Sequence, residues 1–134
     1  MIPRSVRSAL IALVISSLPA SALAQSPQHR WVRVTTDNYD NVYRIDKNVA
    51  GRGRFRRYWM SVILPNSAPD DYKWKKVLSS IDCQTLQRRI RMRVYYKADG
   101  KIYDSNNYSG GGPEENTPRK SIEGRIASIA CSLK

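Results

Sequence analysis

The sequence contains very little histidine and cysteine. Histidine occurs once, at His29, and cysteine twice, at Cys83 and Cys131. A single histidine leaves a Ser-His-Asp arrangement or a histidine-based metal site without a second credible member. The two cysteines also lack the Cys-x-x-Cys spacing of a redox-active pair. We therefore expect a protein that is not an enzyme, with no catalytic residues, no metal and no cofactor.

Long hydrophobic runs are absent as well, except near the N-terminus. There, Arg4 and Arg7 precede an almost wholly apolar run over residues 9–18, and Ala22-Leu23-Ala24 follows it. This order is typical of a signal peptide, and the run is shorter than the roughly 20 residues that span a bilayer. We predict cleavage near Ala24 and an exported protein, located in the periplasm, at the outer-membrane surface or outside the cell.

The cysteine count fits this export prediction. An exported chain with an even number of cysteines is normally oxidised, so we expect Cys83 to pair with Cys131. The length leaves room for one small domain with a single core. We predict a signal peptide over residues 1–24, a mobile N-terminus over 25–30 that includes His29, and a single domain over 31–134.

Six segments of the chain have the composition and alternation of β-strands. They are residues 31–35, 42–46, 54–64, 72–83, 89–96 and 102–108. In the fourth, Val77, Ser79, Ile81 and Cys83 share one face, which directs Cys83 inward. In the fifth, strict alternation places Ile90, Met92, Val94 and Tyr96 on one face and Arg89, Arg91 and Arg93 on the other.

A helix is expected at the end of the chain, after a glycine-rich segment over residues 109–117 that we expect to be mobile. Thr117 or Ser121 is its predicted cap, and Gly124 should weaken it by about 1 kcal/mol. Its apolar stripe, Ile122, Ile126, Ile129 and Ala130, leads to Cys131. The predicted class is α+β: a six-stranded antiparallel meander sheet with one C-terminal helix, packed on one face and held by the disulfide. An open sheet and a partly closed barrel both remain compatible with the pattern.

These residues resemble a known family. The features are Trp31-Val32, Val42-Tyr43, Trp59, Asp82-Cys83, Tyr95-Tyr96, and a closing Pro118, Ser121, Ile122, Ile126 and Cys131. The sequence resembles the surface-adhesin protein E family of exported bacterial domains over essentially the whole segment after the signal peptide. The resemblance implies a six-stranded antiparallel sheet with a C-terminal helix fastened by a disulfide, and it implies adhesion to host or surface components.

Positive charge is the one abundant feature that could be functional, with 23 Lys and Arg against 11 Asp and Glu. A cationic sheet face with interleaved aromatic residues would attract anionic polymers. The candidate polyanion-binding residues are Arg54, Arg56, Lys73, Lys75, Arg89, Arg91 and Arg93. Charged sheet faces more often serve only solubility, and that alternative stays open.

Other polar and aromatic residues have a more ordinary interpretation. We expect at least two of Trp31, Trp59 and Trp74 to be core residues. The acidic pairs Asp70-Asp71 and Glu114-Glu115 could bind a cation or pair with arginines, but solvated loop positions are the usual role.

Two functional hypotheses follow from the sequence. The first is an exported binding domain that holds a host or envelope protein, an anionic glycan or lipopolysaccharide through a basic sheet face. The second is an envelope structural or assembly domain that self-associates, for example as a homodimer, and has no separate ligand. Nucleic acid is not an expected partner of an exported protein.

Overall fold

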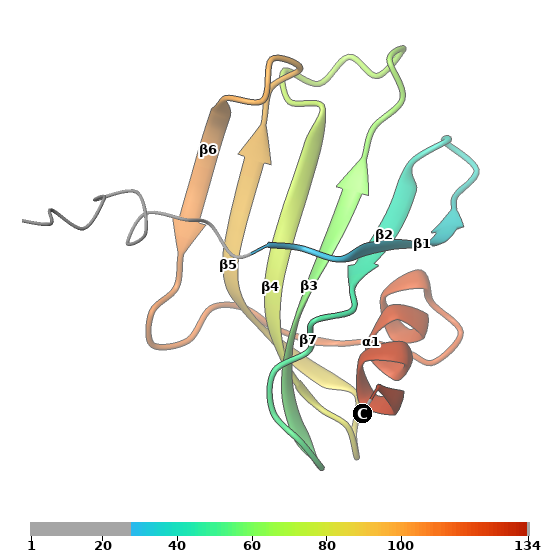
Figure 1. The fold of residues 1–134 in the computed structure, drawn as a ribbon, viewed down its shortest axis with the longest axis vertical. Helices are drawn as coiled ribbons and strands as arrows, with labels where there is room; N and C mark the ends of the chain where they lie inside the picture. Colours follow the sequence, from blue (N-terminus) through green and yellow to red (C-terminus); the bar gives the residue numbers. More distant parts are fainter. Residues whose placement is uncertain (1–27, 134) are drawn as a thin grey trace, which may run out of the picture.

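Each of the first five strands pairs with the next one along the chain in this computed structural model, which describes residues 28–133. The predicted signal peptide and its cleavage site lie outside the described residues. Figure 1 shows the resulting antiparallel meander and helix α1 beside it. The predicted fold class is confirmed. The strands are β1 (Trp31–Thr36), β2 (Val42–Asp46), β3 (Phe55–Ile63), β4 (Trp74–Asp82), β5 (Gln87–Tyr96) and β6 (Ile102–Asn107), and the helix is α1 (Ile122–Ser132).

A seventh, short strand adds to the meander. β7 (Glu114–Asn116) pairs with the first half of β5, where Glu114 lies opposite Arg89. We expected residues 109–117 to form a mobile loop, whereas their second half is part of the sheet. The physical reason is charge: Glu114 and Glu115 pair with arginines of β5, as described below.

The two faces of the sheet differ in what covers them. Helix α1 packs on one, here called the helix face, through Ile126 and Ala130, neither of which is exposed. The opposite side, here called the open face, carries Trp59, Leu78 and Met92, which are paired neighbours on β3, β4 and β5. The buried hydrophobic core on the helix face comprises Ile45, Tyr58, Met60, Val62, Val77, Ile81, Leu86, Ile90, Ile126, Ala127 and Ala130.

Helix α1 begins at the later of the two predicted caps. The Ser121 hydroxyl accepts a hydrogen bond from the Gly124 N–H at 3.0 Å. A Cβ atom at Gly124 would lie 1.8 Å from the Pro118 carbonyl oxygen, so no residue with a side chain fits there without displacement of the backbone. Glycine is therefore required at position 124, because the backbone of Thr117 and Pro118 approaches it closely. The lower helix propensity of glycine is a consequence of this packing.

Two contacts fix the C-terminal end of α1. The predicted disulfide joins Cys83, just after β4, to Cys131 in the last turn, with a Cα–Cα distance of 5.6 Å. From β3, the Arg56 guanidinium donates hydrogen bonds to the carbonyl oxygens of Ala130, at 3.1 Å, and Leu133. Because the last turn has no basic residue of its own, Arg56 supplies the positive charge that stabilises a helix C-terminus.

A shift of register between β4 and β5 changes which arginines share a face. Leu78 lies opposite Met92, but the next residue, Ser79, lies opposite Ile90, which leaves Arg91 as the extra residue of a β-bulge. The side-chain alternation of β5 is therefore interrupted. Our prediction that Arg89, Arg91 and Arg93 line one face is wrong for Arg93, which pairs with Val77 on the helix face, and our prediction that Ile90 shares a face with Met92, Val94 and Tyr96 is wrong for Ile90, which pairs with Ser79 on the helix face.

Candidate functional site

The chain crosses the open face just before β1, as the blue segment in Figure 1 shows. His29 lies at this crossing and hydrogen-bonds to two strands: its Nδ1 is 2.7 Å from Asp46 Oδ2, and its Nε2 is 3.0 Å from Lys76 Nζ. Burial alone would raise the pKa of the Asp46 carboxyl, but hydrogen bonds from His29 and two backbone N–H groups lower it on balance. We expected His29 to lie in a mobile N-terminus. It is instead packed onto the sheet.

The tryptophans belong to this covered part of the open face. None of the three is a buried core residue, so our expectation of at least two core tryptophans is wrong. Trp74 stacks on Tyr96 with 4.0 Å between ring centroids, and the Arg44 guanidinium lies 5.0 Å from the Trp31 ring and 5.9 Å from the Trp74 ring. Because these rings already have ring or cation partners, the cluster is better suited to holding β1 on the sheet than to stacking against a ligand.

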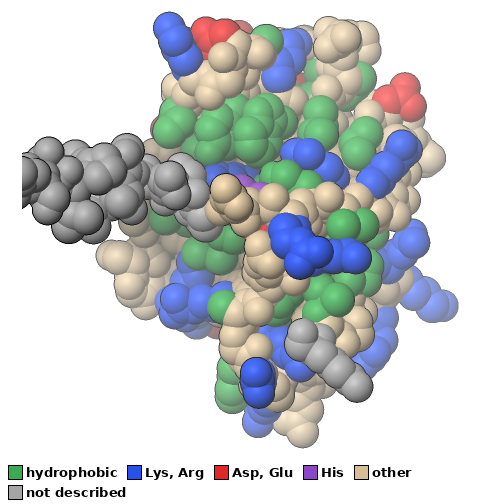
Figure 2. Space-filling view, in the orientation of Figure 1, with side chains coloured by type: hydrophobic (Ala, Val, Ile, Leu, Met, Phe, Trp, Pro, Cys, Tyr) green, Lys and Arg blue, Asp and Glu red, His purple; other side chains and the backbone are tan. Residues whose placement is uncertain are grey.

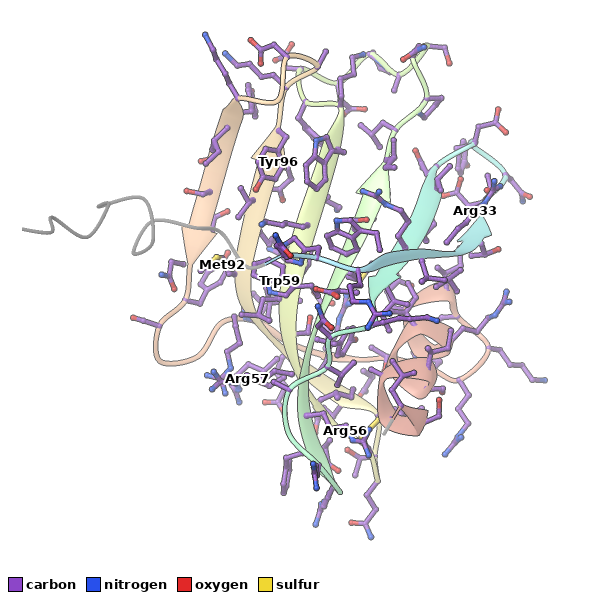
Figure 3. All side chains as sticks on the ribbon, in the orientation of Figure 1. Arg33, Arg56, Arg57, Trp59, Met92 and Tyr96 are labelled. Carbon is purple, nitrogen blue, oxygen red and sulfur yellow. A yellow bond between two sulfur atoms is a disulfide. The ribbon has the colours of Figure 1, made fainter. Side chains whose placement is uncertain are left out.

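An open groove lies beyond this cluster, toward the end of β4. Its volume is about 630 Å³, within the usual range of ligand sites. In Figure 3, Arg57 lies below Trp59 on the same side of the sheet, whereas Arg56 lies beside α1. We call this hollow the arginine groove; Arg57, Ser80, Arg89, Arg91 and Glu114 are among the residues that line it.

Each arginine of the groove has a different set of partners. Arg89 is paired with Glu114 at 2.9 Å, so most of its charge is compensated. The Arg91 Nε donates to the Ser80 hydroxyl at 2.8 Å, which fixes the side chain without neutralising it. Arg57 lies directly across from Ser80 on β3. Among residues 28–133, neither Arg57 nor Arg91 takes part in an ion pair.

The groove thus presents the guanidinium groups of Arg57 on β3 and Arg91 on β5, neither paired with a carboxylate within residues 28–133, with the Ser80 hydroxyl of the intervening β4 between them. Guanidinium groups bind sulfate, carboxylate and phosphate through paired N–H donors in a fixed plane. Figure 2 shows that Lys and Arg side chains far outnumber acidic ones over this side of the molecule. The arrangement is suited to holding an anionic group of a larger molecule.

The other predicted basic residues are either bonded to other groups or distant from Arg57 and Arg91. Arg54 forms a two-point pair with Asp82, with both N–O distances at 2.9 Å, and this guanidinium lowers the pKa of the Asp82 carboxyl to about 2. Arg56 lines the groove, but its guanidinium is bonded to carbonyl oxygens at the end of α1. Lys73 lies just before Trp74, the first residue of β4, and about 23 Å along the strand from Ser80.

Two further candidates lie on the helix face. Lys75 and Arg93 line a second pocket there, and Arg93 is 3.6 Å from Glu115. Glu115 also pairs with the largely buried Arg88, at 2.7 Å. Of the seven residues predicted from the sequence, Arg56, Arg89 and Arg91 line the arginine groove: Arg89 is paired with Glu114, Arg56 is bonded to carbonyl oxygens at the end of α1, and Arg91 is bonded only to the Ser80 hydroxyl.

Arg57 was absent from the predicted set, although a signal for it was present. It is two residues before Trp59, so simple alternation along β3 places both on one face. The acidic partners of the β5 arginines were harder to predict from the sequence, because Glu114 and Glu115 follow a run of glycines that is typical of a loop. Their pairing with β5 depends on β7, which no strand pattern in the sequence predicted.

The comparison with known proteins agrees with this architecture. The model of the family described as surface-adhesin protein E matches residues 31–132, which extend from the first residue of β1 to the last residue of α1. The chain belongs to the surface-adhesin protein E family. No curated protein and no solved structure matches it.

Membership of the surface-adhesin protein E family has consequences at a coarse level. A surface adhesin is an exported protein, and its task is to bind host or surface molecules. Such a task suggests a protein that is not an enzyme. Within residues 28–133, no helix has both the length and the apolar character that a membrane crossing requires.

Proposed function

We propose that this surface-adhesin protein E family member is an exported binding domain that holds an anionic group of a surface molecule in the arginine groove. The observation that carries the proposal is the pair Arg57 and Arg91, which flank Ser80 and have no acidic partner among residues 28–133. The chemistry they recognise is a sulfate, carboxylate or phosphate group. Sulfated or acidic glycans and lipopolysaccharide both carry such groups.

The neighbouring contacts support a specific site over a general positive field. Ser80 holds Arg91 in place, and β7 with Glu114 holds Arg89 at the side of the groove. A guanidinium fixed in this way loses less side-chain entropy when it binds an anion than a free surface lysine does. Exposed Phe55 at the groove adds apolar contact area, since its side chain is 65% exposed.

The test is retention on immobilised heparin, eluted with a salt gradient. Replacing Arg57 and Arg91 together with glutamine should lower the eluting salt concentration sharply, because each charged hydrogen bond lost weakens binding roughly tenfold. The matched control replaces Arg33 and Lys101, which are exposed and outside the groove, and changes the net charge equally. Equal losses in both double variants would show that diffuse charge alone explains retention, and would contradict the proposal.

A second arm identifies the source of the anionic group. The wild type and both double variants are titrated with lipopolysaccharide as well as with heparin, at matched salt. If the wild type binds only heparin or only lipopolysaccharide, and the Arg57/Arg91 variant loses that binding, the class of ligand is assigned. A concentration-dependent dimer that binds neither would instead favour a self-associating structural domain.

A further inference from the structure

The helix face has a pocket of its own, which shares Arg88 in its lining with the arginine groove. Helix α1 packs against β2 and β3, which leaves the half of this face over β4 and β5 without a covering helix. The pocket there has a volume of about 510 Å³, a size typical of small-molecule sites. Its walls come from residues 39–43, the β3–β4 connection and the first turn of α1, which contributes Glu123.

The base of this pocket is apolar. Met60, Val62, Val77 and Ile90 lie on adjacent strands, and each is at most 5% exposed. Tyr43 and Tyr72 are among the half-buried residues of the walls. A ligand body in this space would therefore contact carbon atoms at the base and at the tyrosine rings, while the rest of the lining is largely polar.

A lysine side chain, Lys75, lines the pocket beside this apolar base. Lys75 lies directly between Val62 and Tyr95 in the strand pairing, and it lines the pocket. Among residues 28–133, no ion pair and no side-chain hydrogen bond includes its ammonium group. An amine in such a position is stabilised by any anion that enters the pocket, because an opposite charge offsets the cost of partial burial.

The surrounding charges favour an anion at Lys75. The cations Arg93 and Arg88 and the acids Glu123, Glu115 and Asp70 lie around the pocket, and Glu115 is engaged by the two arginines. Burial is the largest cause that lowers the pKa of the Lys75 ammonium; Arg93 and Arg88 lower it further, and Glu123 and Glu115 raise it. Since the Glu115 carboxylate is already engaged, Arg93 is placed to help Lys75 hold an anion.

From this geometry we infer that the helix-side pocket binds an anionic amphiphile, a molecule with a carboxylate or sulfonate on an aromatic or short acyl body. The anionic group pairs with Lys75 and Arg93, and the body lies over Met60, Val62 and Val77. The anion-binding groups of this site, Lys75 and Arg93, lie on the opposite face of the sheet from Arg57 and Arg91, although Arg88 lines both hollows. One protein molecule can therefore hold a ligand in the arginine groove and another in the helix-side pocket at the same time.

The test uses a pair of fluorescent probes that differ in charge. The anion 1-anilinonaphthalene-8-sulfonate and the neutral N-phenyl-1-naphthylamine share the same rings, and decanoate serves as a competitor. The wild type should bind one sulfonate probe per folded chain, release it on addition of decanoate, and bind the neutral probe at least tenfold more weakly. Equal affinity for both probes, or no binding of the sulfonate by the folded protein, would overturn the inference.

Variants separate the role of charge from that of folding. Lys75→Met keeps the length of the side chain and removes its charge, so it should weaken the sulfonate probe about tenfold and leave the neutral probe unchanged or tighter. Lys97→Met, at an exposed position outside the pocket, is the matched control and should bind both probes like the wild type. Retention of full sulfonate affinity by Lys75→Met, with an unchanged melting temperature, would also overturn the inference.

Discussion

Arg91 and Arg93 extend from opposite faces of β5, although a single residue separates them in the sequence. Arg91 donates to Ser80 on the open face, and Arg93 lies opposite Val77 on the helix face and near Glu115. In a regular strand, residues two apart share a face, so the extra residue of the bulge causes this separation. It divides what looks like one arginine stripe into two sites of different character.

This separation predicts different effects for two otherwise similar substitutions. Arg91→Gln should lower the salt concentration at which the protein elutes from heparin, whereas Arg93→Gln, which removes the same charge, should change it little. Arg93→Gln should instead weaken the sulfonate probe in the helix-side pocket. Equal effects of both variants on heparin elution would contradict the placement of the two side chains on opposite faces.

The disulfide should contribute a large part of the stability. Cys83 and Cys131 close a loop with a sequence separation of 48 residues, for which the chain-entropy estimate is about 4 kcal/mol. Cys131→Ser should therefore lower the free energy of unfolding by about that amount in non-reducing urea denaturation. The double variant Cys83→Ser/Cys131→Ser controls for the remaining free thiol and should lose a similar amount. Unchanged stability in both would refute the role of the bond.

Gly124→Ala should destabilise the protein even though alanine is the better helix former. The added Cβ would lie 1.8 Å from the Pro118 carbonyl oxygen, and the strain should exceed the roughly 1 kcal/mol gained in helix propensity. We expect a net loss of about 1–3 kcal/mol in urea denaturation. Arg125→Ala, at the next and exposed position, should change stability by less than about 0.5 kcal/mol. A more stable Gly124→Ala variant would show that the close approach does not exist.

The pair of Arg54 and Asp82 should be visible in a titration. The guanidinium lowers the pKa of the Asp82 carboxyl from 3.8 to about 2, so the folded state binds this proton less readily than the unfolded state does. The stabilisation is fully present above the unfolded pKa and is lost as the pH falls through about 2. Carboxyl carbon shifts followed by NMR should show this value, and Arg54→Gln should return it toward 3.8. An unchanged midpoint in the variant would contradict the pairing.

The sequence was sufficient for the fold because its main determinants are local. The alternation of β4 predicted that Val77, Ser79 and Ile81 face the core, and the position of Cys83 and Cys131 predicted the bond that ties α1 to the sheet. Ser121 was one of two predicted caps, and the structure selects it. Each of these depends on a residue's immediate neighbours or on a simple count.

The candidate site was harder to predict, because it depends on contacts between distant segments. The bulge at Arg91 arises from the register between β4 and β5, and no pattern within β5 alone reveals it. The pairing of Arg89 with Glu114 and the packing of His29 on Asp46 likewise join residues far apart in the chain. Which arginines keep an uncompensated charge follows only from those contacts.

The most direct test of the arginine groove is an NMR titration of the wild-type protein with a heparin tetrasaccharide, observing the arginine side-chain Nε–Hε signals. The largest shift changes should fall on Arg57 and Arg91, with smaller changes at Arg89 and none at Arg93. Uniform small changes across all arginines, or changes centred on Arg93, would contradict the account.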